Sequence, residues 1–346
     1  MRNNPCWKLA RLLPALPLLA GLITTSSISA HAAEIESPPS LTLKELRAKH
    51  ALPNSRYMDV DGANLHYVDE GSGPVVVLLH ASYHSLRTWD ALAARLTENY
   101  RVVRFDFPTA GLSQDNKPVP PEKFSMMDRY VDTVSGVVDA LGIERFTLLG
   151  TSSGGAVAFR YASRNQDKLE RLVLLNTAGM PRIPRNNPLR ERPAVSKWQG
   201  MKVRPREFWA FSLAENFIAP NKAPDWLIDQ AYDFSRVEGR ADRARDYKYS
   251  TGDPQAILGL VTAPTLIMWG KNNPTVMHLE ADVVQHWLTG APSTIRKYAG
   301  LGHYPYVEDL DAIYPALSTF IAGDLDKDLR RTTMLSAEVT CDCDSN

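Results

Sequence analysis

Phe146-Thr147-Leu148-Leu149-Gly150-Thr151-Ser152-Ser153-Gly154-Gly155 is the stretch that decides the fold. It places Gly-x-Ser-x-Gly directly after an apolar, strand-like run and directly before the helix-like run 155–164. A serine at such a sharp turn has a strained backbone, so the residues two positions away must be small. The pattern predicts Ser152 as a nucleophile, with the helix N-terminus favouring a developing oxyanion. The alternative is a Gly/Ser turn that merely joins a strand to a helix.

Strand-like and helix-like runs alternate on both sides of this turn. The expected strands are 56–60, 64–68, 74–79, 100–105, 146–149, 172–175, 264–269 and 294–298. The expected helices are 88–99, 125–141, 155–164, 205–216, 225–237 and 310–321, with a short one capped by Thr42 and ending at His50. This alternation predicts an α/β fold in which helices cover both faces of a mostly parallel, eight-stranded sheet.

The segment boundaries follow from composition. Residues 1–32 combine a basic start, an apolar run and small residues, the order of a cleaved signal peptide, so we expect a periplasmic or secreted protein. An uncleaved membrane anchor is the alternative. The other expected segments are a linker with a helix (33–54), a core (55–179 and 256–325), a helical lid after the sixth strand (180–255) and a polar tail (326–346).

Charge and cysteine content exclude several classes of protein. The 346 residues include 39 basic and 39 acidic side chains, and 44 % are hydrophobic, which excludes a disordered chain and a strongly basic nucleic-acid binder. Of the three cysteines, Cys6 lies in the expected leader and Cys341 and Cys343 lie in the tail, which excludes a disulfide framework. We expect a small-molecule substrate, no metal or organic cofactor, no nucleic acid and no stable membrane insertion.

A serine nucleophile needs a histidine within hydrogen-bond reach. His303 lies in Gly302-His303-Tyr304-Pro305, in a loop between the last expected strand and the closing helix. A loop at this place can carry an imidazole to Ser152, so His303 is the predicted base.

Two further stretches complete a family resemblance. They are Leu78-Leu79-His80-Ala81-Ser82, with Trp89 shortly after it, and Asp106-Phe107-Pro108-Thr109-Ala110-Gly111-Leu112-Ser113. With Ser152 and His303, they make residues 55–325 resemble the α/β-hydrolase fold superfamily, and most of all its lid-bearing serine hydrolases of the esterase, haloperoxidase-like and C–C-hydrolase-like kinds. The resemblance implies an oxyanion hole formed by the backbone N–H groups of Ser82 and Ser153, and a structural role for His80.

Three positions depart from the pattern of that family. Ala81 and Thr109 stand where glycines are usual, which puts the loops near the oxyanion hole in question. Asn273, in Trp269-Gly270-Lys271-Asn272-Asn273-Pro274, stands where the acid that orients the histidine is expected, and Asn176 stands at the other position that some relatives use.

An asparagine can accept a hydrogen bond from the imidazole, but it cannot stabilise an imidazolium by charge. The loss can reach about 10⁴-fold, and an amide that presents its NH₂ group favours the unproductive tautomer. A carboxylate at a non-standard place is the alternative. The candidates are Asp253, Glu280, Glu308 and Asp309.

These residues predict an exported serine hydrolase acting on a carboxylic ester, thioester, lactone or similar acyl bond, with Ser152, His303 and Asn273 in the site. The alternative is a weakly active or inactive relative that binds an apolar ligand under its lid. A lyase or cofactor-free peroxidase-like activity on the same residues is a third possibility, because the fold does not separate these chemistries.

The lid sequence leaves the role of its basic residues open. They form either a solvated face or an entrance that attracts anions. These residues are Arg182, Arg185, Arg190, Arg192, Lys202, Arg204 and Arg206.

Overall fold

The computed structural model describes residues 38–118, 125–181, 198, 201, 203–218, 223–240, 250 and 252–324. All of them belong to one compact unit, residues 37–346. The expected leader and tail, with the three cysteines, lie outside the described residues, and so do five basic residues of the lid sequence, Arg182, Arg185, Arg190, Arg192 and Lys202. Export and cleavage of the leader therefore remain predictions.

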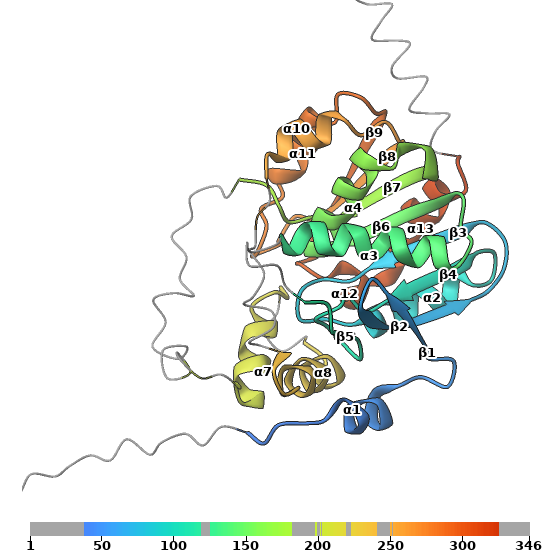
Figure 1. Ribbon diagram of the computed structural model, residues 1–346. Coiled ribbons are helices and arrows are strands. Elements are labelled where there is room, and N and C mark those ends of the chain that lie inside the picture. Colours follow the sequence, from blue (N-terminus) through green and yellow to red (C-terminus); the bar gives the residue numbers. More distant parts are fainter. Residues whose placement is uncertain are drawn as a thin grey trace, which may run out of the picture. The chain divides into compact units, whose positions relative to one another are not determined.

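The described part of the chain forms one sheet with the order β1-β2-β4-β3-β6-β7-β8-β9, and β5 pairs with β2 (Figure 1). The strands are β1 (Arg56–Val60), β2 (Ala63–Glu70), β3 (Val75–Leu79), β4 (Arg101–Phe105), β5 (Gln114–Asp115), β6 (Phe146–Thr151), β7 (Leu169–Leu175), β8 (Thr265–Gly270) and β9 (Ser293–Tyr298). β1 and β2 are antiparallel to their neighbours, whereas all pairs from β4 to β9 are parallel. The predicted α/β class with a mostly parallel sheet is confirmed.

Helices cover both faces of this sheet. They are α1 (Leu43–His50), η1 (Leu86–Trp89), α2 (Asp90–Leu96), α3 (Met126–Ala140), α4 (Ser153–Arg164), η2 (Gln166–Lys168), α7 (Arg206–Ala214), α8 (Asp225–Ser235), α10 (Pro254–Gly259), α11 (Glu280–Trp287), α12 (Pro305–Glu308) and α13 (Leu310–Ile321). Polar caps start several of them. Thr42 and Glu45 form the capping box of α1, and Asp309 caps α13 by accepting from the N–H of Ala312.

Three sequence predictions need correction in detail. The sheet has nine strands, because the two-residue β5 pairs with β2 through Asn64 and Gln114 and is too short to give a sequence pattern. The inserted segment consequently follows the seventh strand in chain order, β7, and not the sixth. The predicted helix 88–99 is the 3-10 turn η1 followed by the shorter α2.

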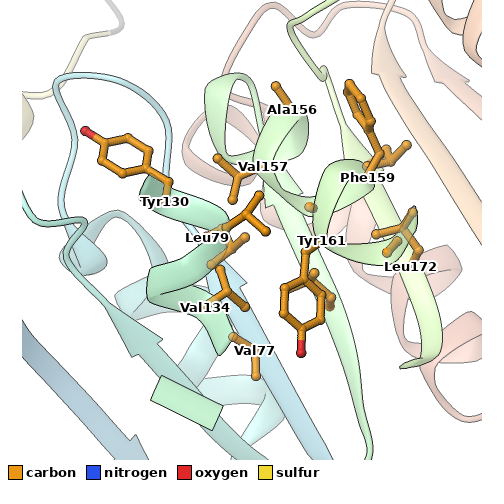
Figure 2. Packing of buried hydrophobic residues seen from close by; sticks show 14 of the residues in the cluster. Val77, Leu79, Tyr130, Val134, Ala156, Val157, Phe159, Tyr161 and Leu172 are labelled. Atoms are coloured by element: carbon orange, nitrogen blue, oxygen red, sulfur yellow. The ribbon is translucent and has the colours of Figure 1, made fainter. Parts of the chain in front are cut away.

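β3 shows why the sheet has two hydrophobic cores. Its run of five apolar residues sends Val77 and Leu79 to one face and Val76 and Leu78 to the other, because strand side chains alternate. Figure 2 shows Val77 and Leu79 beside side chains of α3 and α4, among them Val134 and Val157. On the opposite face α2 and α13 supply the partners, so β3 is buried on both sides as predicted.

The segment between β7 and β8 contains α7 and α8, two helices that the sequence predicted, and the structure shows that they contact each other. α1 packs on α8, because a β-bridge joins Leu41 to Val237, and His50 and Lys49 contact the buried carboxylate of Asp233 at 2.7 and 2.6 Å. Within the described residues no helix is long and apolar enough to span a bilayer. Whether α7 and α8 act as a lid remains a prediction.

Candidate active site

Ser152 lies between β6 and α4 with φ 51° and ψ −121°, a left-handed conformation that is strained for a serine. The glycines of the motif make this turn possible. A Cβ atom on Gly150 would lie 2.3 Å from the carbonyl oxygen of Gly154, and one on Gly154 would lie 2.5 Å from those of Leu79 and His80. The strand-to-helix turn predicted from the sequence is therefore present, and it holds Ser152 at the carboxyl end of the parallel strands.

His303 faces this serine. Its Nε2 lies 3.0 Å from Oγ of Ser152, although 151 positions separate the two residues in the sequence. The imidazole is buried, whereas Ser152 is half-buried and reachable from outside. The pair has the spacing needed for proton transfer between a hydroxyl and an imidazole.

Asn273 lies on the other side of the imidazole. Its side-chain nitrogen Nδ2 is 3.0 Å from Nδ1 of His303. Its oxygen Oδ1 accepts hydrogen bonds from the backbone N–H groups of Thr275 and Val276, at 2.9 and 3.0 Å. These two donors fix the amide, because turning it over would set its NH₂ group against both N–H groups.

The fixed amide decides which imidazole nitrogen carries the proton. Nδ2 of Asn273 can only donate, so Nδ1 of His303 must accept, and the neutral ring then carries its proton on Nε2. Nε2 points at Ser152 and donates to its oxygen in this state. The arrangement therefore favours the tautomer that cannot take a proton from Ser152.

Asn176, the other predicted position for the orienting group, bonds the backbone of the histidine loop. Its Nδ2 donates to the carbonyl oxygens of Gly302 and His303, at 3.1 and 2.9 Å, and its Oδ1 accepts from the N–H of Gly270 at 3.0 Å. The residue is fully buried with φ 45°. Asn176 thus joins the ends of β7 and β8 to the loop that carries His303.

Two more residues hold the backbone of this loop. Glu308 accepts from the N–H groups on either side of the histidine, with 2.9 Å to Gly302 and 3.0 Å to Tyr304. The backbone oxygen of Asn216, which follows α7, accepts from the N–H of His303 at 2.9 Å. The loop is therefore held from β7, from α12 and from the inserted segment at once.

The other candidate carboxylates have structural partners. Asp253 accepts from the N–H groups of Gln255 and Ala256 and caps α10. Asp309 caps α13, and Glu280 accepts from the N–H of Met277 at the start of α11. Asn273 differs from these acids, because its side-chain nitrogen lies 3.0 Å from Nδ1 of His303.

The predicted oxyanion residues lie together beside Ser152. Ser82 donates from its hydroxyl to the hydroxyl of Ser153 at 2.9 Å. Ser153 is the first residue of α4, where a backbone N–H has no partner within the helix. Positive φ occurs at Tyr83 and Gly111 and not at Ala81 or Thr109, so both departures from glycine fit without backbone strain.

His80 is a structural residue, as the sequence predicted. One ring nitrogen, Nδ1, lies 2.7 Å from the carbonyl oxygen of Ala81, and the other accepts from the N–H of Phe107 at 3.1 Å. Burial lowers the pKa of His80, which keeps the ring neutral. The buried Asp106 accepts from the N–H groups of Leu86 and Leu112 and pairs with His66, so the loops around the site share one anchor.

A cavity of about 550 Å³ opens beside Ser82 and Ser153. Its apolar wall comes from the core and from the inserted helices, and includes Phe107, Met126, Met127, Trp209 and Phe234. Arg204 and Arg240 also line it. No cluster of His, Cys, Asp or Glu suited to a metal ion occurs among the residues that the structure describes.

Comparison with known families matches this geometry. Residues 76–316 fit the model of the alpha/beta hydrolase family, which spans both the Ser152 turn and the His303 loop. The chain belongs to the alpha/beta hydrolase family. The family resemblance drawn from the sequence is therefore confirmed.

Two relatives of this α/β hydrolase match over most of their length. A cis-3-alkyl-4-alkyloxetan-2-one decarboxylase of Shewanella oneidensis is 25% identical over 293 residues, which cover 78% of this chain and 89% of the relative. A 2-hydroxy-6-oxononadienedioate/2-hydroxy-6-oxononatrienedioate hydrolase of a Pseudomonas species is 26% identical over 287 residues. These residues cover 78% of this chain and 97% of the relative.

Solved structures show the same fold. The enol-lactonase of Burkholderia xenovorans superposes with a TM-score of 0.62 at 23% identity. The match covers 77% of this chain and 100% of the enol-lactonase chain. A meta-cleavage product hydrolase of Pseudomonas fluorescens gives a TM-score of 0.64 at 20% identity, covering 78% and 98%.

Sequence reasoning missed the residues that brace the site. Asn216 and the bonding role of Glu308 have no motif, because each acts through backbone atoms of a loop elsewhere in the chain. Arg240, which lines the cavity, was not singled out, and for Arg204 the sequence left a solvated face and an anion-attracting entrance open, since it gives no sign of which way a basic side chain faces. Glu308 was expected only as an alternative orienting carboxylate, whereas in the structure it accepts from two backbone N–H groups of the histidine loop.

Proposed function

We propose that this α/β hydrolase cleaves a carboxylic ester, a lactone or a similar acyl bond through Ser152 and His303. The observation that carries the proposal is the distance of 3.0 Å between Oγ of Ser152 and Nε2 of His303, at a strained turn beside a helix N-terminus. The names of two similar proteins, an enol-lactonase and an oxetan-2-one decarboxylase, denote lactone substrates and support this substrate class.

The proposed reaction proceeds through an acyl-serine. Oγ of Ser152 attacks the carbonyl carbon while its proton passes to Nε2 of His303, and the N–H groups of Ser82 and Ser153 bind the oxyanion. His303 then protonates the leaving oxygen, and a water molecule attacks the acyl-serine with His303 as the base. A ring-opened lactone leaves as a hydroxy acid, and an ester leaves as an acid and an alcohol.

Asn273 makes the first step slow. His303 can accept the serine proton only when its own proton is on Nδ1, where it would oppose the NH₂ group of Asn273. We therefore propose activity on acyl groups with good leaving groups or ring strain, for which weaker activation of the serine suffices. The mechanism uses the protein's own side chains and backbone and needs no metal or organic cofactor.

A second function is favoured by the same amide. A relative that binds an apolar ligand between the core and α7 and α8, with little or no turnover, would tolerate Asn273 in its observed orientation.

Under either function we propose that α7 and α8 act as a lid and that the protein is exported to the periplasm or secreted. The order of residue types in positions 1–32 supports export.

A fluorophosphonate probe and short-chain nitrophenyl esters separate the two functions. We expect labelling and ester turnover that are both lost in Ser152→Ala and reduced at least about 100-fold in His303→Ala. Ser163→Ala, a half-buried hydroxyl at the far end of α4, is the control. A folded protein without labelling or turnover at neutral or alkaline pH would leave ligand binding as the function.

A further inference from the structure

The cavity beside Ser82 and Ser153 has charge of one sign. Arg204 and Arg240 line it, and no aspartate or glutamate does among the described residues of its wall. The cavity otherwise offers apolar side chains and a few hydroxyls, such as those of Thr109 and Ser235. Two cations in a largely apolar wall need an explanation, because desolvating an unpaired charge is costly.

Arg240 is held in place by neutral acceptors. Its guanidinium donates to the carbonyl oxygens of Gly111 at 2.8 Å, Phe234 at 3.2 Å and Ser113 at 2.7 Å. Burial lowers the pKa of Arg240 to about 10, which still leaves it charged at neutral pH. The carboxylate of Asp106 acts on it from a distance, but that carboxylate bonds to His66 and to two backbone N–H groups.

Arg204 has a different support. Its guanidinium carbon lies 4.3 Å above the ring centre of Phe208, and it makes no ion pair within the described chain. Stacking uses the face of the guanidinium and leaves the N–H groups at its edge available for a planar anion. Arg206, two positions later, instead pairs with the exposed carboxylates of Asp225 and Asp229 at 2.7 and 2.6 Å.

We propose that Arg204 and Arg240 bind a carboxylate carried by the acyl chain of the substrate, at the end remote from the carbonyl that Ser152 attacks. The inference rests on the proposed function and narrows it to acyl compounds with an apolar middle and an anionic end. Charge-assisted and bidentate bonds to guanidinium groups give such recognition its strength and its direction.

The test compares two esters that differ only at that end. In 4-nitrophenyl hydrogen glutarate, a carboxylate replaces the terminal methyl group of 4-nitrophenyl valerate. We expect kcat/KM to favour the glutarate ester over the valerate ester by about tenfold or more, and Arg204→Met to remove most of this preference. Arg206→Met, which loses surface ion pairs, is the matched control and keeps the preference.

Arg240 needs a milder change because it ties the loop at Gly111 and Ser113 to α8. Arg240→Lys keeps the charge but loses the paired N–H donors of the guanidinium. We expect the kcat/KM preference for the glutarate ester over the valerate ester to fall about tenfold. Circular dichroism and thermal melting show whether each variant is folded before its kinetics are compared.

Binding to Ser152→Ala separates this inference from the proposed function. By calorimetry we expect monomethyl glutarate to bind this variant more tightly than methyl valerate, and the difference to vanish when Arg204→Met is added. Ser152-dependent hydrolysis without any preference for the anionic ester or ligand would overturn the carboxylate site and leave the hydrolase. Tight binding of monomethyl glutarate without turnover of either ester would support the site and refute the hydrolase.

Discussion

The amide nitrogen of Asn273 lies 3.0 Å from Nδ1 of His303, and two backbone N–H groups hold the amide oxygen on the opposite side. A carboxylate at this place would accept from the same two N–H groups with one oxygen and from Nδ1–H with the other. Asn273 keeps the interaction with the two backbone N–H groups, but it donates to Nδ1 of His303 where a carboxylate would accept from Nδ1–H. One atom, nitrogen in place of oxygen, therefore sets the tautomer of the predicted base.

Asn273→Asp is expected to raise activity. The new oxygen accepts from Nδ1–H, frees Nε2 to take the serine proton and stabilises the imidazolium, so we expect kcat/KM to rise by about 10²- to 10⁴-fold. The rate of fluorophosphonate labelling should rise in parallel. Asn272→Asp is the control, because that exposed side chain bonds the N–H of Gly300 and not the imidazole. An unchanged rate in a folded Asn273→Asp protein would show that the tautomer is not limiting.

Glu308→Gln is expected to loosen the histidine loop. The two carboxylate oxygens each accept from one N–H, of Gly302 and Tyr304, and a glutamine can keep only one of these bonds. We expect a loss of about 2 kcal/mol in the free energy of unfolding, together with a lower kcat. Urea denaturation and ester kinetics measure both. The exposed Glu207→Gln on α7 should leave both quantities unchanged. An equal effect of Glu207→Gln would show that the losses do not come from the histidine loop.

Asn176→Asp is expected to be more damaging than the other Asn-to-Asp changes. It removes both donors to the carbonyl oxygens of Gly302 and His303 and buries a negative charge against them. We expect about 3 kcal/mol of destabilisation and nearly complete loss of labelling by the probe. Asn116→Asp, an exposed position, provides the comparison in denaturant melts. Stability within 0.5 kcal/mol of the parent, about the size of an ordinary surface effect, would contradict this role.

The buried His84 predicts a dependence of stability on pH. Burial lowers its pKa from the ordinary 6.5 to about 3, so the unfolded chain takes up a proton below pH 6.5 that the folded chain does not. This contribution to stability is complete above pH 6.5 and declines by up to about 1.4 kcal/mol per pH unit as the pH falls toward 3. His84→Asn keeps a partner for Thr88 and should flatten the curve between pH 6 and 4, whereas the exposed His286→Asn should not.

Asp233→Asn is expected to release α1 from α8. The buried carboxylate contacts Lys49, His50 and Arg236 at 2.6 to 2.7 Å, and an amide leaves the cations Lys49 and Arg236 without their counter-charge. We expect about 3 kcal/mol of destabilisation and faster proteolytic cleavage around residue 50. Asp229→Asn, which breaks a more exposed pair with Arg206, should cost less than about 1 kcal/mol. Similar effects of the two changes would refute a special role for the buried pair.

Most of the sheet was predictable because each strand carries its own pattern. The apolar run of β3 and the alternation of strands with helices depend on neighbouring residues, and local rules read them well. β5 was not predicted, because its two residues are too few to show a hydrophobic periodicity. The start of α4 was placed two residues late, because Ser153 and Gly154 are poor helix formers that belong to the sharp turn at Ser152.

The residues that the sequence nominated for the candidate site lie together in the structure. Ser152 and His303 have local signatures, a Gly-x-Ser-x-Gly turn and a Gly-His loop after the last strand, and Asn273 stands in a recognisable stretch. The residues that hold the histidine loop in place have no local signature that predicts this role. Asn176, Asn216 and Glu308 bond the backbone of one loop from places up to 127 positions away, and such contacts leave no pattern in the sequence.

By itself the sequence determined the α/β fold, the predicted nucleophile, the predicted base and the absence of a carboxylate at the expected position, because each depends on which residues stand side by side in the chain. Tertiary structure alone decided which atom of Asn273 meets the imidazole, since that follows from the N–H groups of Thr275 and Val276 in the folded turn. It also separated Arg204, which lines the cavity, from Arg206, which pairs at the surface. Arg204 and Arg206 stand only two positions apart in the chain, and only the packed protein shows which of them faces inward.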